Sequence, residues 1–241
     1  EKAVSIVEAL DYDFSKWKKS SALIGAIVRT RMFDQDVQAF LSEHPAGTVV
    51  EIGSGLNTRF ERLDNGQVQW FDLDLPDSLA LRRHFFQDEP RRTMIEASVV
   101  DTNWMEIVAA TGGPWCFIAE AVLIYLTAPQ VRQAITQIAQ RFPGAWLLTD
   151  TTAQKMVASQ ATHDLMKHMP PESWFRWVCD DPYEIETWAN LRLIQSRTFL
   201  DADAELIQYA PWQTRFFMQW LPWLFRYKIQ GYRLYRFVIE P

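Results

Sequence analysis

The chain of 241 residues contains little cysteine, little glycine and no surplus of positive charge. Its two cysteines, Cys116 and Cys179, permit at most one disulfide and lack the paired spacing of a thiolate zinc site. This excludes a disulfide-rich scaffold, and we expect no bound metal. With 24 Lys and Arg against 30 Asp and Glu, the formal charge of -6 has the wrong sign for a protein that grips phosphate backbones. We therefore expect no nucleic-acid partner.

Long hydrophobic runs are also missing. No stretch reaches the roughly 18 uninterrupted apolar residues of a membrane-spanning helix, and the first residues lack the basic-then-apolar order of a secretory signal. The sequence predicts a cytoplasmic protein without stable membrane insertion and leaves open whether it is a monomer or a homodimer. Apolar residues make up 48% of the chain and include 15 Phe and 11 Trp, enough for one α/β domain with a sizeable core.

Hydrophobic periodicity alternates between helix and strand. A helical pattern before His44 gives way to Thr48–Gly53, a β-branched run typical of a strand buried on both faces of a parallel sheet. Further strands are predicted at 68–73, 93–100, 115–120, 145–150, 191–200 and 232–239, with a helix at 77–86 capped by Asp77 and helices at 104–110 and 129–141. This alternation predicts a three-layer α/β fold. We interpret residues 1–241 as one domain with N-terminal helices over 1–45, a core over 46–150 and 191–241, and a helical cap inserted at 151–190.

Two of the nine glycines follow the first predicted strand, in Glu51-Ile-Gly53-Ser-Gly55. A glycine where a strand turns into a helix lets a ligand approach the backbone, because no Cβ stands in the way. A dinucleotide fingerprint would place a third small residue at Thr58, which disfavours an NAD-dependent oxidoreductase. Acidic Glu51 suits a cationic or amine-bearing ligand, and enzymes that use S-adenosylmethionine (SAM) commonly show such a turn. A tight turn without a ligand is the alternative.

Acidic residues close the next predicted strands. Asp72 and Asp74 share a face by pleat alternation, at a place where a carboxylate can accept the hydroxyls of a ribose. One of the two is expected to be solvated or to cap the following helix. Asp101 either meets an adenine amine or caps the helix after it. Glu120 follows an apolar strand, where a carboxylate is costly unless it is paired.

Three blocks of sequence and the spacing between them carry a resemblance to a known family. The blocks are Arg29–Asp34 before the first strand, Val49–Arg59 followed by Trp70–Pro76, and Ala119–Leu126. Over about residues 20 to 150 the chain resembles the leucine carboxyl methyltransferase family, which includes bacterial tetracenomycin-type polyketide O-methyltransferases. The resemblance implies a Rossmann-like class I methyltransferase sheet, mostly parallel with an antiparallel last strand. It also implies SAM as cofactor and S-adenosylhomocysteine as product.

The resemblance further assigns roles to individual residues. Arg29 would pair with the methionyl carboxylate of SAM, since a planar guanidinium bonds both oxygens, whereas Arg31 faces elsewhere on its helix. The other implied contacts are Gly53 against the cofactor, Asp74 on the ribose, Asp101 with Thr102 on the adenine, and Glu120 near the methionyl amine or sulfonium. Asn57 replaces the aspartate usual in the family, and we expect it to cap its helix.

Methyl transfer needs an acceptor held at attack distance with water excluded, and no catalytic residue is obligatory. A carboxylate acceptor needs no base, whereas a phenol or alcohol would gain from a histidine. His163 and His168 are weak base candidates, with helix-surface histidines as the alternative. Aromatic residues and methionines in the cap predict an apolar acceptor pocket. The candidate acceptor contacts are Tyr125, Met166, Trp174 and Trp177.

The sequence therefore predicts a SAM-dependent O-methyltransferase that acts on a hydroxyl or carboxyl of a small, aromatic or polyketide-like metabolite. A protein C-terminal carboxyl methyltransferase is the first alternative, and it would need a basic residue to meet the peptide carboxylate. Arg176, Arg192 and Arg197 cannot be placed from sequence for this role. A non-catalytic SAM-binding protein is the second alternative.

Overall fold

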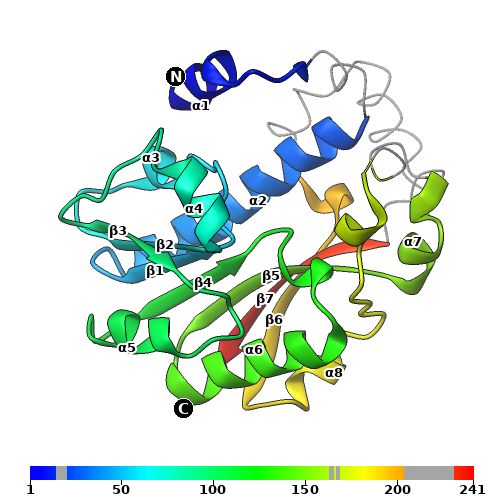
Figure 1. Cartoon of the computed structure of the whole chain (residues 1–241). Helices are drawn as coiled ribbons and strands as arrows, with labels where there is room; N and C mark the ends of the chain where they lie inside the picture. The colour runs from blue at the N-terminus through cyan, green and yellow to red at the C-terminus, as the bar shows by residue number, and fades with distance from the viewer. Residues whose placement is uncertain (15–20, 163–165, 167–168, 204–230) are drawn as a thin grey trace.

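The computed structural model describes residues 1–14, 21–162, 166, 169–203 and 231–241 (Figure 1). In these ranges, seven strands form one sheet in the order β3-β2-β1-β4-β5-β7-β6. The strands are β1 (Thr48–Ile52), β2 (Gln69–Asp74), β3 (Arg92–Glu96), β4 (Trp115–Ala119), β5 (Trp146–Thr152), β6 (Leu191–Arg197) and β7 (Tyr232–Ile239). The first five pair in parallel, and β7 lies antiparallel between β5 and β6. The predicted fold, a mostly parallel α/β sheet with an antiparallel last strand, is confirmed.

Helices cover both faces of this sheet (Figure 1). The α-helices are α1 (Lys2–Ala9), α2 (Ser21–Glu43), α3 (Arg59–Leu63), α4 (Pro76–Arg82), α5 (Asn103–Ala109), α6 (Ala128–Arg141), α7 (Gln154–Ala158) and α8 (Tyr183–Glu186). Short 3-10 helices are η2 (Leu123–Tyr125), η3 (Gln160–Thr162), η5 (Pro171–Ser173) and η6 (Phe199–Asp201). Among the helices of the described part of the chain, none combines the length and hydrophobicity needed to cross a bilayer.

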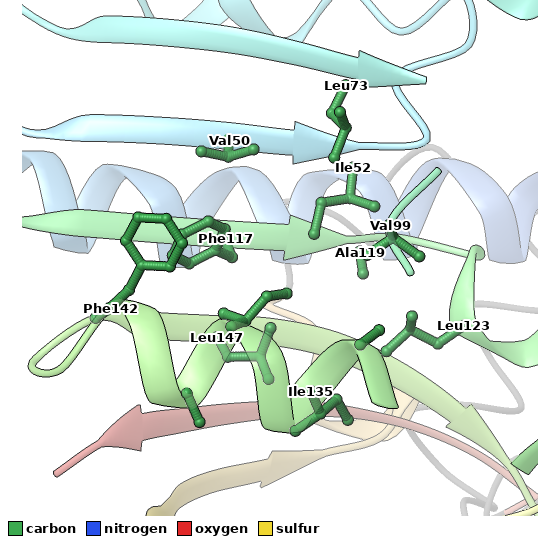
Figure 2. Close-up of a cluster of buried hydrophobic side chains, with 14 of the residues drawn as sticks. Val50, Ile52, Leu73, Val99, Phe117, Ala119, Leu123, Ile135, Phe142 and Leu147 are labelled. Carbon is green, nitrogen blue, oxygen red and sulfur yellow. The ribbon is translucent and has the colours of Figure 1, made fainter. Parts of the chain in front are cut away.

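Two clusters of buried side chains fill the two sides of the sheet. Figure 2 shows the larger one, where Val50, Phe117 and Leu147 from the strands meet Ile135 of α6. The second cluster packs α2 and α3 against the opposite face. Every residue of β1 is buried, because alternate side chains enter different clusters. This explains why the strand reads as a β-branched run interrupted only by Glu51.

Two expected helix caps are corrected by the structure. Helix α4 begins at Pro76 with Leu75 at the N-cap position, so Asp77 lies inside the first turn instead of capping it. The fixed φ angle of proline is already helical, which favours Pro76 as the first helical residue. Helix α3 takes Thr58 as its N-cap residue. The side chain of Asn57 instead accepts a hydrogen bond from Arg62 Nη2 at 3.3 Å.

Candidate functional site

Acidic side chains gather where the parallel strands end at their carboxyl edge. Pleat alternation decides their side of the sheet, because each follows by two positions a strand residue that packs in the α2 and α3 cluster. The carboxylates placed on this side are Glu51 after Val49, Asp72 after Trp70, Glu120 after Ile118 and Asp150 after Leu148. Helices α2 and α3 supply the arginines that face Glu51, Glu120 and Asp150 at this edge, the rim of the sheet. Asp72 is fully buried and pairs with other arginines.

Arg59 lies at the centre of this ionic network. Its guanidinium is fully buried, and Nε donates to Asp34 Oδ1 of α2 at 2.9 Å. The remaining nitrogens Nη1 and Nη2 donate to Glu51 and Glu120. One buried cation thus joins carboxylates from α2, β1 and the turn after β4, as a buried charge must be paired. We did not single out Arg59 from the sequence, although it lies in the glycine-turn block that carried the family resemblance.

Arg29 of α2 holds the other side of Glu120. Its Nε donates to Glu120 Oε1 at 2.9 Å, and Thr30 Oγ1 donates to the same oxygen at 2.7 Å. Burial raises the pKa of Glu120, but the charges of Arg59 and Arg29 outweigh burial and hold the pKa below its ordinary value. The two arginines therefore favour the anionic form of Glu120. The predicted pairing of Glu120 is made by the chain itself.

Asp150 fixes the turn that carries Glu120. Both of its carboxylate oxygens accept the N–H of Ala121, at 3.0 and 2.9 Å, and Ala121 has a left-handed backbone with a φ of 54°. The hydroxyl of Tyr232 donates to Asp150 Oδ2 at 2.6 Å and accepts from Arg29 Nη1 at 3.1 Å. Burial raises the pKa of Asp150 to about 6, although Arg29 opposes the rise. Asp150 and Tyr232 were not predicted from the sequence; the position of Asp150 two residues after buried Leu148 was the available signal.

The glycine turn after β1 takes left-handed backbone at two positions. Gly53 has a φ of +65° and Gly55 a φ of +46°. A Cβ on Gly53 would stand 2.3 Å from Val122 Cγ2, so the chain's own packing already uses the missing side chain. The side of Gly53 on which a Cβ would stand is therefore filled by the chain itself, and the predicted contact of this residue with the cofactor stays a prediction. Gly55 donates its N–H to Asp74 Oδ2 at 2.7 Å, and the other Asp74 oxygen accepts the N–H of Leu75 at 2.8 Å.

The structure does not bring Asp72 to the rim of the sheet. Its carboxylate is fully buried and accepts from Trp70 Nε1 at 3.2 Å, Arg82 Nη2 at 3.1 Å and Arg92 Nε at 2.7 Å. Pairing by two buried arginines satisfies this carboxylate inside the protein. Its expected contact with a ribose is therefore corrected: only Asp74 of the pair is partly exposed at the strand end.

Asp101 and Thr102 lie exposed in the loop after β3. Asp101 Oδ2 accepts the N–H of Ser98 at 3.1 Å, and Thr102 occupies the N-cap position of α5. The alternative in which Asp101 caps that helix is thus replaced by a hydrogen bond within its own turn. The expected contact of both residues with an adenine stays a prediction.

The four candidate acceptor contacts divide between the two sides of the sheet. Tyr125 ends η2 and lies 5.4 Å from the ring of Phe175 between centroids. Trp174 Nε1 donates to the carbonyl of Met166 at 3.2 Å, and both side chains pack in the α2 cluster. Trp177 is buried in the opposite cluster against Trp188, so the structure does not place it with the other three. His163 and His168 lie outside the described residues.

Two buried polar atoms near the glycine turn have no hydrogen-bond partner, Glu51 Oε2 and Ser54 Oγ. Burial raises the pKa of Glu51 to about 7; Arg59 lowers it, and the neighbouring carboxylate of Asp72 adds to the rise. An orphaned carboxylate oxygen costs free energy unless a ligand completes its hydrogen bonds. The turn therefore has the properties of a site for a ligand with a cationic or hydrogen-bond-donating group.

The raised pKa of Glu51 predicts how stability depends on pH. The folded state binds the proton more tightly than the unfolded state, so the free energy of unfolding falls as pH rises from about 4.5 to about 7. Relative to Glu51→Gln, which cannot titrate, the native protein should lose about 2–3 kcal/mol between pH 5 and pH 8. Urea unfolding of both proteins at the two pH values measures this. A stability difference between the two proteins that stays constant with pH would contradict the assignment.

A glycine turn after the first strand of a sheet of this order defines a Rossmann-like α/β fold, and solved methyltransferase structures share it. A putative methyltransferase from Thermobifida fusca aligns with a TM-score of 0.61 at 17% identity over 90% of this chain and 82% of that one. The N-methyltransferase NodS from Bradyrhizobium japonicum, in complex with S-adenosylhomocysteine, aligns with a TM-score of 0.55 at 14% identity over 100% and 99%.

The chain belongs to the leucine carboxyl methyltransferase family, whose model matches residues 5–139. It is 25% identical over 203 residues to the tetracenomycin polyketide synthesis O-methyltransferase TcmP of Streptomyces glaucescens, covering 83% of this chain and 74% of the relative. It is 24% identical over 250 residues to the S-adenosyl-L-methionine-dependent methyltransferase dpfgK of Gibberella zeae, covering 91% and 80%. The chain is therefore a SAM-dependent methyltransferase, and the predicted family, enzyme class and cofactor are confirmed.

The residues present fit SAM. This cofactor carries a carboxylate, an ammonium, a sulfonium, two ribose hydroxyls and an adenine, so it needs one cationic partner and several anionic ones. The side chain of Arg29 is partly exposed at the rim, with 21% of its surface accessible, and it is the cationic partner. Glu51 offers a carboxylate oxygen without a hydrogen-bond partner. Asp74 retains lone pairs beyond its two backbone contacts, since a carboxylate offers about four acceptor positions.

Proposed function

We propose that the enzyme methylates an oxygen of a small, aromatic or polyketide-like metabolite, either a hydroxyl or a carboxyl. The observation that most supports this acceptor class is an apolar wall beside the ionic rim, formed by Tyr125 with Phe175, Trp174 and Met166. Burial raises the pKa of Tyr125, the charge of Arg29 lowers it and the charge of Asp150 raises it. The tyrosine of the apolar wall therefore lies close to these two residues of the ionic rim. Aromatic surfaces of this kind bind flat apolar ligands. The relative TcmP, a polyketide O-methyltransferase, supports the same class.

The order of the strands supports one direction for the cofactor. β2 and β3 lie on one side of β1, and β4 and β5 lie on the other. We assign the adenosine end to the first side, with Asp74 at the ribose and Asp101 with Thr102 at the adenine. The methionyl end then lies on the second side, where Glu120 faces the amine and Arg29 the carboxylate. The glycine turn lies between the two ends, as expected for a ligand crossing the carboxyl edge of such a sheet.

When bound, SAM supplies an electrophilic methyl carbon, and the chain's residues position it. Arg29 and Glu120 orient the methionyl end, and the apolar wall excludes water from the acceptor. With SAM bound, the lone pair of the acceptor oxygen would form the new bond to the methyl carbon, and S-adenosylhomocysteine would leave with the electrons of the carbon–sulfur bond. A carboxylate acceptor loses no proton, whereas a hydroxyl acceptor must release one; His163 and His168 remain predicted bases for that case.

We further propose that the segment 151–190 acts as the cap over this site. The N–H groups of Arg176 and Trp177 donate to the carbonyl of Ile124 at 2.8 and 3.2 Å, which ties the segment to η2 beside the rim. Within the segment, the side chain of Gln160 accepts the N–H of Phe175 at 2.8 Å, which fixes the shape of the segment. A cap tied to η2 in this way would keep the apolar wall next to the transferred methyl group.

The name of the family supports the alternative function, that of a protein C-terminal carboxyl methyltransferase. It needs a basic residue free to meet a peptide carboxylate, yet Arg192 pairs with Glu240 at 2.8 Å and Arg197 donates to Asp36. The Arg192 pair lies at the edge of the sheet opposite the rim, because Arg192 is level with Val238 and Trp146. Arg197 ends β6 at the carboxyl edge, but its guanidinium is already engaged by Asp36. We therefore favour a small-molecule acceptor working in the cytoplasm, in secondary metabolism. The buried free thiols Cys116 and Cys179 are consistent with that compartment.

Radiolabelled methyl transfer from SAM into separate metabolite and protein extracts tests the proposal. We expect label in the small-molecule fraction, and treatment with base distinguishes the acceptor group, because methyl esters hydrolyse whereas methyl ethers do not. Label confined to a protein C-terminus would favour the alternative function. No transfer to either extract, with SAM bound, would favour a non-catalytic SAM-binding protein.

The placement of SAM predicts the effect of removing Arg29. Arg29→Ala should weaken SAM binding by about 1–3 kcal/mol, because a charge-assisted hydrogen bond to the methionyl carboxylate is lost. Isothermal titration calorimetry measures the change. Arg31→Ala is the matched control, since Arg31 is more exposed and lies 3.7 Å from Asp34, away from Glu120. Equal affinities for the native protein and Arg29→Ala would remove Arg29 from the site.

A further inference from the structure

Arg82 of α4 donates hydrogen bonds to backbone carbonyls of the glycine turn. Its Nη1 donates to the carbonyl oxygens of Gly55 at 2.7 Å, Asn57 at 3.0 Å and Ser54 at 3.3 Å. Its Nη2 donates to Asp72 Oδ1 at 3.1 Å. We propose that Arg82, held in place by Asp72, is a positioning residue that sets the turn in its cofactor-binding shape. This inference rests on the proposed placement of SAM at the turn.

The cost of this arrangement argues against a role in packing alone. The side chain of Arg82 is fully buried, lies over the ring of Phe86 at 4.2 Å, and leaves its Nε without a partner. A buried guanidinium with an unsatisfied donor is expensive, and apolar side chains of similar volume often replace buried ion pairs without loss of stability. What an apolar residue cannot supply is the set of hydrogen bonds to the turn.

These bonds also orient the other side of each peptide unit. A peptide group is planar with its C=O and N–H pointing in opposite directions, so carbonyls turned toward Arg82 aim the following N–H groups away from it. The N–H groups concerned belong to Gly55, Leu56 and Thr58, and that of Gly55 meets Asp74 at the rim. Arg82 thereby links Asp72, in the core, to Asp74, at the proposed ribose position.

The test compares Arg82→Met with Arg92→Met. Arg92 bonds the same Asp72 and lies over the same Phe86 ring at 4.8 Å, but it donates its other hydrogen bond to Glu61, at 2.7 Å, and not to the turn. We expect Arg82→Met to weaken SAM binding at least tenfold in calorimetry with an unchanged far-UV circular dichroism spectrum. Arg92→Met should change affinity less than threefold. In Arg82→Ala, millimolar methylguanidinium should restore part of the affinity, which a general loss of packing would not permit.

Each outcome decides between the inferences. Unchanged affinity in Arg82→Met, or an equal loss in both methionine variants, would overturn the role of Arg82. If Arg29→Ala weakens SAM binding and Arg82→Met does not, this inference fails and the cofactor placement stands; if neither does, the placement itself fails.

Should Arg82→Met not fold, Arg82→Lys keeps the charge beside Asp72 but cannot reach three carbonyls, because its ammonium is a compact point charge. At least a fivefold loss of affinity with an unchanged melting temperature then supports the proposal, and a smaller loss contradicts it.

Discussion

Replacing Arg59 by alanine should lower the free energy of unfolding by about 3–5 kcal/mol, because removal of one partner from a buried ionic network leaves the others uncompensated. Three carboxylates depend on this guanidinium, those of Asp34, Glu51 and Glu120. Asp34 and Glu120 retain other arginine partners, whereas Glu51 would lose its direct ion pair. Urea unfolding with an unchanged slope would show that stability, and not the unfolded state, has changed.

Arg62→Ala is the control for this prediction. Arg62 bonds the same Asp34, with Nε at 2.8 Å from Oδ2, but 26% of its side chain is exposed to solvent. Since partly exposed pairs contribute little, we expect a loss of about 1 kcal/mol or less. Equal losses in the two variants would mean that Asp34, and not the burial of three carboxylates around Arg59, controls the stability of this region.

The second large effect is expected from Gly53→Ala. Left-handed backbone with a Cβ costs about 1–2 kcal/mol, and overpacking a dense site costs about 1–3 kcal/mol. Both apply here, because Gly53 has a φ of +65° and its new Cβ would stand 2.3 Å from Val122 Cγ2. We therefore expect a total loss of about 2–5 kcal/mol in thermal or urea unfolding, together with weaker SAM binding, since Val122 follows Glu120 by two residues.

Two further variants separate the cost of left-handed backbone from the cost of the steric clash with Val122. Gly66→Ala has a similar left-handed φ of +80° and no atom within 4 Å of the new Cβ, so it should show the backbone cost alone. In the double variant Gly53→Ala with Val122→Ala, the clashing Cγ2 is absent and the steric part should be recovered as a coupling energy. Additive losses in that double variant would contradict the packing argument.

Local patterns were sufficient for the sheet and for the acidic residues at its carboxyl edge. The β-branched run before Gly53 marked β1, and acidic residues after apolar strands marked the rim at Glu51, Asp74 and Glu120. Motif spacing was sufficient for the family. The cap at Asp77 was wrong, because a proline one residue earlier already supplied a helical φ angle.

The pairing of charges could not be read from the sequence. Asp72 and Asp74 share a face and lie two residues apart, yet one is buried between Arg82 and Arg92 and the other lies at the rim. Likewise, Arg59 meets Asp34 across 25 residues, and Asp150 meets Tyr232 across 82.

The sequence by itself determined the order of elements, the glycine turn and the presence of acids at strand ends, because hydrophobic periodicity and backbone freedom are local properties. Only the tertiary structure decided which acids remain available to a ligand. That choice depends on burial and on partners brought together from distant segments, and a charged side chain is satisfied or left incomplete only when those segments pack.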